Sequence, residues 1–179
     1  MTKDEKIDFL GLISKPLKAN VILYGNRNSG KTQTLRILYL MLGGKNPKFL
    51  NKGNTWKRET LTYNHQIIGI CLDGDTLEIV EGNVAFFANN NCDVAFSPTH
   101  IGGPTVMPMQ YFIEKNTESA KNCNIECTVW KKQPELRNHY KVSIEKDKLL
   151  NLSVWKKAYP QSYAMAEKLK KLLDDGFFF

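Results

Sequence analysis

The sequence lacks any long hydrophobic run. Within its 179 residues, no apolar stretch approaches the roughly 18 residues that a membrane-spanning helix needs. We therefore expect no membrane partner. The first residues, MTKDEK, carry charges of both signs, and no long apolar segment follows them. A secretory signal instead begins with positive charge and continues into an apolar segment. The sequence therefore predicts a cytoplasmic protein.

Cysteine is scarce, with four residues in the chain. Cys71 and Cys92 lie in apolar, strand-like runs, where cysteine behaves as a small hydrophobic residue. Cys123 and Cys127 are close in sequence, but no second pair with the spacing of metal ligands accompanies them. We expect reduced structural thiols rather than disulfides or a zinc site.

Internal repeats and low-complexity linkers are also missing. Hydrophobic residues make up 42% of the chain and charged residues 24%, which is ordinary for a globular protein. The length suits one domain with a substantial core. The sequence therefore predicts a single domain over residues 1–179.

One segment, residues 21–42, organises the chain. A β-branched and aromatic run at residues 21–24 leads into GNRNSGKT at residues 25–32, which matches the phosphate-binding pattern G-x-x-x-x-G-K-[ST]. A helical pattern follows. Gly25 and Gly30 permit the close approach of an anion. The loop amides and the helix N-terminus can then surround phosphate oxygens.

The pattern assigns roles to individual side chains. Lys31 would reach the β- and γ-phosphates and act in catalysis, and the Thr32 hydroxyl would ligate Mg²⁺. The residues expected to contact the nucleotide are Gly25, Asn26, Arg27, Asn28, Ser29, Gly30, Lys31, Thr32 and Gln33.

In its strand, loop and helix, this segment resembles the P-loop nucleoside-triphosphatase superfamily, and the resemblance covers about 20 residues. It implies a three-layer α/β fold in which helices flank a mainly parallel central sheet, with ATP and Mg²⁺ as ligands. The guanine-reading tetrad Asn/Thr-Lys-x-Asp is missing, so GTP is the weaker candidate. The Leu-Ser-Gly-Gly signature of transporter ATPases is missing as well.

An acidic residue, Asp73, follows the second of two strands predicted after this segment. Residues 58–64 and 66–72 read as two strands joined by a tight turn near Asn64 and His65. The second strand is almost continuously apolar, which is typical of the middle of a parallel sheet. Asp73 follows it and resembles the P-loop aspartate beside magnesium, as a catalytic residue and metal ligand. The alternative is an aspartate in an Asp-Gly turn. Asp75 is the expected helix cap or second carboxylate.

A strand at residues 92–96 follows a predicted helix at residues 76–90, which is the spacing of a parallel crossover. The polar loop at residues 97–105 should lie outside the carboxyl ends of the strands, where ligands of such sheets bind. His100 is the histidine candidate for catalysis there. The alternative is a histidine in a surface turn.

Other predicted elements complete the domain. The first half adds a short helix ended by Pro16, a buried helix over residues 35–42 closed by Gly43 and Gly44, and a basic loop from Asn46 to about Lys57. The second half adds a helix at residues 106–115, strands at residues 124–131 and 140–144, a charged turn at residues 145–148, and a helix from Pro160 capped by Gly176. That last helix carries an apolar stripe of Met165, Leu169, Leu172 and Leu173. Residues 177–179 should pack within the molecule or dock on a partner protein.

The net charge of +7 is concentrated in residues 45–58 and 131–157, which are interleaved with tryptophans. Trp56, Trp130 and Trp155 could stack on bases while lysines neutralise phosphates. Solvated lysines around half-buried tryptophans explain the same pattern. A nucleic-acid partner is therefore possible but not favoured.

Three functions remain open. The first is Mg²⁺-dependent ATP hydrolysis or ATP-dependent switching. The second is a small-molecule or nucleotide kinase, with Asp73 or Asp75 orienting an acceptor hydroxyl. The third is a nucleotide-binding module that acts with a protein or nucleic-acid partner. Kinases usually carry arginines on a lid over the phosphates, and residues 98–109 contain none. This absence favours the first function.

Overall fold

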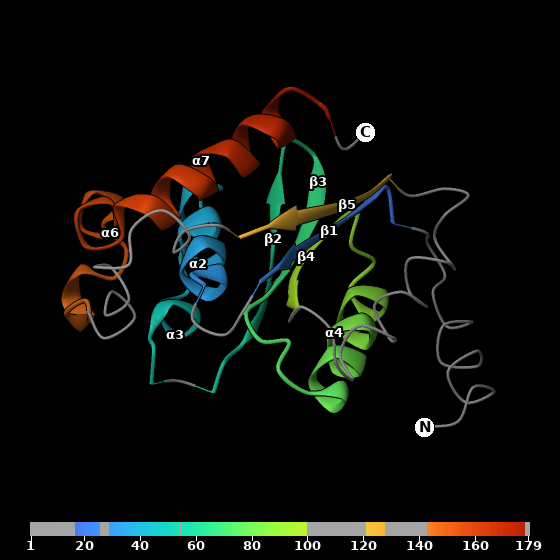
Figure 1. The fold of residues 1–179 in the computed structure, drawn as a ribbon, viewed down its shortest axis with the longest axis horizontal. Coiled ribbons are helices and arrows are strands. Elements are labelled where there is room, and N and C mark those ends of the chain that lie inside the picture. Colours follow the sequence, from blue (N-terminus) through green and yellow to red (C-terminus); the bar gives the residue numbers. More distant parts are fainter. Residues whose placement is uncertain (1–16, 26–28, 54, 100–120, 128–142, 178–179) are drawn as a thin grey trace.

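A mixed, mostly parallel sheet of five strands forms the centre of the protein, with helices on both of its faces (Figure 1). The computed structural model describes residues 17–25, 29–53, 55–99, 121–127 and 143–177. The strand order is β2-β3-β4-β1-β5. The predicted α/β class is confirmed.

The elements follow one another in the order expected of an α/β chain. The strands are β1 (Ala19–Tyr24), β2 (Arg58–Tyr63), β3 (Gln66–Cys71), β4 (Val94–Thr99) and β5 (Lys121–Glu126). The helices are α2 (Lys31–Met41), α3 (Pro47–Leu50), α4 (Leu77–Asn89), α6 (Leu152–Ala158) and α7 (Pro160–Asp174), and a 3₁₀ turn, η2 (Lys146–Lys148), precedes α6.

Four strands run in the same direction. β1 pairs in parallel with β4 on one side and β5 on the other, and β3 pairs in parallel with β4. Tyr24 at the end of β1 lies opposite Thr99 of β4 and Glu126 of β5. The carboxyl ends of β1, β3, β4 and β5 therefore meet at one edge of the sheet.

The hairpin of β2 and β3 corrects one prediction. Its turn is confirmed, because Asn64 and His65 both have left-handed backbone angles, with φ of 48° and 62°. However, β3 does not lie between two parallel neighbours, since β2 pairs with it antiparallel. A two-residue connection can join only antiparallel strands, so the tight turn itself excludes the parallel arrangement on that side.

Two strand boundaries differ from the prediction. β4 continues through Ser97 and Pro98 to Thr99, where a loop was expected. Proline fits there because the ladder between β3 and β4 ends at Phe96, which leaves Pro98 paired with β1 alone. β5 ends at Glu126, earlier than the apolar run that led us to predict a strand at residues 124–131. Pairing with β1 uses backbone groups, so the edge strand forms without a strongly apolar sequence.

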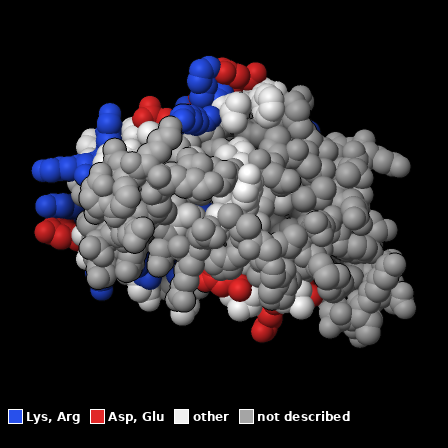
Figure 2. All heavy atoms as spheres, in the orientation of Figure 1, with Lys and Arg blue, Asp and Glu red and all other residues white. Residues whose placement is uncertain are grey.

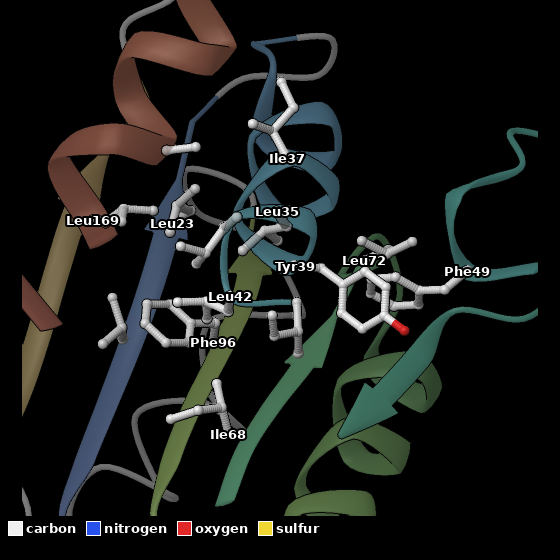
Figure 3. Packing of buried hydrophobic residues seen from close by; sticks show 14 of the residues in the cluster. Leu23, Leu35, Ile37, Tyr39, Leu42, Phe49, Ile68, Leu72, Phe96 and Leu169 are labelled. Carbon is white, nitrogen blue, oxygen red and sulfur yellow. The ribbon is translucent and has the colours of Figure 1, made fainter. Parts of the chain in front are cut away.

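Alternation along the strands divides the core into two layers. Val21 and Leu23 of β1 face α2 and α7, whereas Ile22 between them faces α4. Figure 3 shows the first layer, where Leu23 and Phe96 from the sheet lie near Leu35 of α2 and Leu169 of α7. Helices thus bury both faces of the sheet, which is compatible with a three-layer fold.

Helix α2 is buried almost all round, as predicted: every residue from Lys31 to Tyr39 except Thr32 is buried. Gly43 closes the helix with φ of 93°, and the Gly44 amide donates to the Tyr39 carbonyl at 2.8 Å. The predicted closing glycines are therefore confirmed.

The predicted basic loop after α2 contains the one-turn helix α3, which the sequence analysis missed. The Asn46 side chain caps it by accepting from the Lys48 amide at 3.0 Å, and Pro47 occupies the first turn. The Asn-Pro pair was the signal for this turn.

The last helix, α7, starts at Pro160 as predicted, and Gly176 follows it with φ of 72°. Leu169 and Leu173 of the predicted apolar stripe are buried, whereas Met165 and Leu172 are only half-buried. Ala166, which was not predicted, is buried as well. Phe177 remains 45% exposed, so packing of this residue in the core is not found.

Several predictions lie outside the described residues: the helix before Pro16, the helix at 106–115, the charged residues 131–142, and most of the strand at 140–144. Cys71, Cys92 and Cys127 are buried, as expected of cysteines that act as small hydrophobic residues. In the part of the chain that the structure describes, no helix combines the length and hydrophobicity needed to cross a bilayer.

Candidate functional site

The loop after β1 meets the ends of three other strands. Its first residue, Gly25, follows Tyr24, whose carbonyl accepts a hydrogen bond from the Cys127 amide at 2.8 Å. Thr99 lies opposite Tyr24 on the other side. The candidate loop, residues 25–32, therefore sits at the shared carboxyl edge, where ligands of open α/β sheets bind.

Both glycines of the candidate loop are required by its shape. A Cβ on Gly25 would lie 2.7 Å from Ser29 Oγ and 3.3 Å from the Cys127 carbonyl oxygen. Gly30 has φ of 91°, a left-handed conformation, and forms the N-cap of α2 without a side-chain cap. The loop thus folds back on itself and delivers an uncapped helix N-terminus, a favourable place for an anion.

Lys31 extends back across this loop. Its ammonium Nζ donates to the Gly25 carbonyl at 2.7 Å and to Ser29 Oγ at 3.3 Å, and both acceptors are neutral. The residue is only 8% exposed. Burial lowers the pKa of the Lys31 ammonium, while Cys127 and Asp75 act in the opposite direction. A cation is therefore held, partly desolvated, at the mouth of the loop.

The second half of the candidate site lies at the end of β3. Thr32 Oγ1 donates to the Leu72 carbonyl at 3.2 Å, and Asp73 is the next residue. The Asp73 carbonyl accepts from Asn83 Nδ2 of α4 at 2.7 Å. The structure therefore brings Thr32 and Asp73, the expected metal ligands, to the same place from segments 40 residues apart.

Gly74 holds this segment against β4. A Cβ on Gly74 would lie 2.0 Å from the Pro98 carbonyl oxygen, which is backbone and cannot move aside easily. The turn after β3 thus rests directly on the end of β4 because residue 74 has no side chain.

Asp75 does not cap the next helix. Thr76 is the N-cap of α4, and its Oγ1 accepts from the Ile79 amide at 3.2 Å. A threonine hydroxyl at this position satisfies a free amide of the first turn, so a carboxylate is not needed there. Asp75 is exposed instead and interacts with Lys31 through its charge.

Four of the predicted site residues, Asn26, Arg27, Asn28 and His100, lie outside the described residues. Among the residues that are described, no group of three or more His, Cys, Asp or Glu side chains could hold a metal ion. A magnesium site needs fewer, because Mg²⁺ usually takes one or two carboxylates and completes its shell with water and substrate phosphates. Thr32 and Asp73 fit that donor set.

Two residues that contribute to this region were missed. Cys127 donates from Sγ to the Ser29 carbonyl at 3.0 Å, yet the sequence analysis placed it inside a strand. Arg36 is 2% exposed within α2. The presence of an arginine in a helix that is otherwise apolar almost all round could have indicated a buried cation.

The two described tryptophans lie in different environments. Trp155 is 2% exposed, and its indole N–H donates to the Leu149 carbonyl at 2.8 Å, so it belongs to the core. Trp56 is 47% exposed and donates to Glu59 at 3.0 Å. Trp130 lies outside the described residues. In Figure 2 the blue Lys and Arg groups lie along the left and upper margins of the view, with red acidic groups beside some of them.

Comparison with known proteins gives no family for this chain: no family model matches it, and no match was found among curated proteins or solved structures.

Proposed function

We propose that this protein binds the phosphates of ATP at residues 25–33 and, with Mg²⁺, hydrolyses ATP or uses it as a conformational switch. The observation that carries the proposal is the position of Lys31. Its ammonium donates hydrogen bonds to Gly25 O and Ser29 Oγ, at the N-terminus of a helix whose N-cap residue, Gly30, has no side chain.

Charge supports this reading. A partly desolvated ammonium that hydrogen-bonds neutral acceptors gains more from a phosphate oxygen than an exposed lysine would, because the interaction is less screened. The helix N-terminus adds its partial positive charge to the same anion. Both attractions increase with the number of negative charges on the ligand, which favours a triphosphate.

Thr32 and Asp73 are the residues that would hold magnesium. A bound Mg²⁺ would supply positive charge that offsets the negative charge of the phosphates. The chain's own contribution is to position: Lys31 and the loop orient the phosphates, and the hydrogen bond from Thr32 to the end of β3 fixes the distance between the two halves of the site. Adenine rather than guanine follows from the missing tetrad.

The decisive experiment compares Lys31→Ala with Lys45→Ala, an exposed lysine just beyond the same helix. ATP binding is measured by calorimetry with Mg²⁺ present. We expect Lys31→Ala to bind ATP at least about 100-fold more weakly, because a charge-assisted contact to phosphate is lost. Lys45→Ala should bind like the parent. Equal affinity of parent and Lys31→Ala would contradict the proposal.

A second measurement separates hydrolysis from switching. Phosphate release is followed with Mg²⁺ and with a chelator, in the parent and in Lys31→Ala. Turnover that requires both Mg²⁺ and Lys31 identifies a hydrolase. Tight ATP binding without turnover indicates a switch or a kinase that lacks its acceptor.

A further inference from the structure

Arg36 is a buried cation outside the candidate loop. It lies in α2, beyond the first turn, and is 2% exposed. Its Nε donates to the Phe49 carbonyl at 3.3 Å, and its Nη1 donates to Gln33 Oε1 at 3.3 Å. Both acceptors are neutral.

The guanidinium group retains unused donors. Arginine has five N–H groups, and Arg36 uses two of them in the hydrogen bonds to Phe49 and Gln33. Within the described part of the chain, no carboxylate forms an ion pair with Arg36. Burial lowers the pKa of this guanidinium, which Tyr159 and Asp73 counteract through their charge. A buried cation in this state is costly unless an anion compensates it.

A cavity of about 50 Å³ opens beside Arg36, between α2, the end of α3 and the segment around α6. Its polar lining includes Gln33, Asn51 and Lys52, and Trp155 and Tyr159 form apolar walls. The pKa of the Lys52 ammonium is lowered first by burial and then by the positive charge of Arg36. Two cations therefore face one small cavity, and none of its described lining residues is acidic.

We propose that this cavity, lined by Gln33, Arg36, Asn51, Lys52, Trp155 and Tyr159, is a second anion site that binds a phosphate group. A guanidinium edge with free N–H groups matches the oxygens of phosphate in a bidentate manner. Two positive charges match a phosphate dianion better than a carboxylate. The volume exceeds what a single water needs and admits one phosphate group, but not a nucleotide.

The cavity shares Gln33 with the residues proposed to bind ATP. Among the described residues of the candidate loop, Gly25 and residues 29–32, none lines the cavity. Phosphate could also bind at the candidate loop, so the test is made in the Lys31→Ala protein, where that competing site is weakened. Failure of the cavity proposal and failure of the ATP proposal are then separate results.

The probe is inorganic phosphate, titrated into full-length ¹⁵N-labelled Lys31→Ala protein at constant ionic strength. The readout is the indole N–H resonance of Trp155, assigned with Trp155→Phe. We expect a saturable shift of this resonance. Lys52→Gln, added to Lys31→Ala, should weaken phosphate binding at least about tenfold, because one of two cations at the cavity is lost. Lys48→Gln, which removes a nearby exposed lysine outside the cavity lining, should leave the affinity unchanged.

Two results would overturn the proposal: a shift that does not saturate, or equal phosphate affinity of the Lys52→Gln and Lys48→Gln proteins. Arg36→Lys provides a second test, because it keeps the positive charge but removes the planar guanidinium group. This variant should also bind phosphate at least about tenfold more weakly. If Arg36→Lys does not fold, the Lys52→Gln result decides alone.

A further arm identifies the source of the phosphate. Glycerol 3-phosphate is titrated beside inorganic phosphate in the same protein. Tighter binding of the ester supports the phosphate group of a larger ligand that extends out of the cavity. Tighter or equal binding of inorganic phosphate supports the free ion.

Discussion

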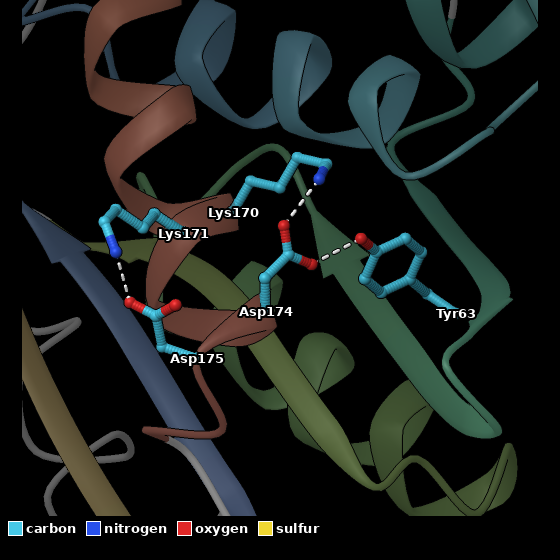
Figure 4. A network of polar contacts seen from close by, with 5 residues as sticks. All are labelled: Tyr63, Lys170, Lys171, Asp174 and Asp175. Carbon is cyan, nitrogen blue, oxygen red and sulfur yellow. Dashed lines mark hydrogen bonds and ion pairs between the residues drawn. The ribbon is translucent and has the colours of Figure 1, made fainter.

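Cations occupy two contrasting environments in this protein. On α7, Lys170 and Lys171 lie near the surface, where Lys170 pairs with Asp174 at 2.6 Å and Lys171 with Asp175 at 2.5 Å (Figure 4). The Tyr63 hydroxyl also donates to Asp174. At the carboxyl edge of the sheet, Lys31 and Arg36 are buried and donate to neutral carbonyl, hydroxyl and amide oxygens.

The pKa shifts follow this contrast. Hydrogen bonds to Asp174 and Tyr63 raise the pKa of Lys170, whereas burial lowers the pKa of Lys31 and Arg36. A surface cation already paired with a carboxylate has little to gain from another anion, and water screens what it gains. A buried cation gains more, because less water screens the interaction. The comparison therefore indicates where ligands of this protein should bind.

The largest expected effect concerns ATP and stability. With Mg²⁺ present, ATP at 100 times its Kd should raise the free energy of unfolding by about 2.7 kcal/mol. Lys31→Ala should lose this increment at the same ATP concentration, and Lys170→Ala should keep it. Urea unfolding with and without ATP measures the difference. Loss of the increment in both variants would remove the distinction between the two environments.

Close packing at the carboxyl edge gives the next effect. Gly74→Ala should lower the free energy of unfolding by about 2 kcal/mol, because its Cβ would meet the backbone of Pro98. Gly53→Ala is the matched control, since the nearest neighbour of that Cβ would be 4.0 Å away. Similar unfolding midpoints for the two variants would mean that the turn after β3 moves freely away from β4.

Thr32→Val tests the hydroxyl proposed for magnesium. ATP binding in the presence of Mg²⁺ should weaken about tenfold, equivalent to about 1.4 kcal/mol, while binding in a chelator should change little. Thr34→Val is the control, because the Thr34 hydroxyl is buried in the same helix without a hydrogen-bond partner in the structure. Equal losses in both variants would point to a defect of the helix rather than of the metal site.

The surface network should matter least. Asp174→Asn should cost about 0.5 kcal/mol of unfolding free energy or less, because the carboxylate is exposed. Lys170 and then Tyr63 lower the pKa of Asp174 by hydrogen bonding. Its contribution is therefore present above the usual carboxyl pKa and is lost as the pH falls below about 4. Urea unfolding of parent and variant at several pH values should show the difference shrinking in acid.

Local patterns predicted the segments whose signal is contained in a few neighbouring residues. The strand before Gly25, the helix after Gly30, the turn at Asn64 and His65 and the start of α7 at Pro160 are all found. Each depends on glycine, asparagine or proline backbone preferences, or on a continuous apolar run. These act over a few residues and need no knowledge of the rest of the chain.

Predictions failed where segments far apart in the sequence determine strand pairing or burial. Pro98 is accommodated in β4 because β3 no longer pairs there, and β5 is positioned by its pairing with β1 rather than by its own apolar run. The sequence around Trp155 suggests either a side chain that stacks on bases or a half-buried one among lysines, but packing within the core buries it. Neither strand pairing nor burial can be read from the flanking residues alone.

The sequence by itself determined the GNRNSGKT motif, its strand and helix, and hence the hypothesis of phosphate binding, because glycine geometry and hydrophobic periodicity are local properties. Only the tertiary structure decided that Thr32 reaches the end of β3, that Cys127 contacts Ser29, and that Arg36 is buried beside a cavity with Lys52. Parallel strand pairing brings these residues together, and burial changes the energy of their charges, so both depend on the whole fold.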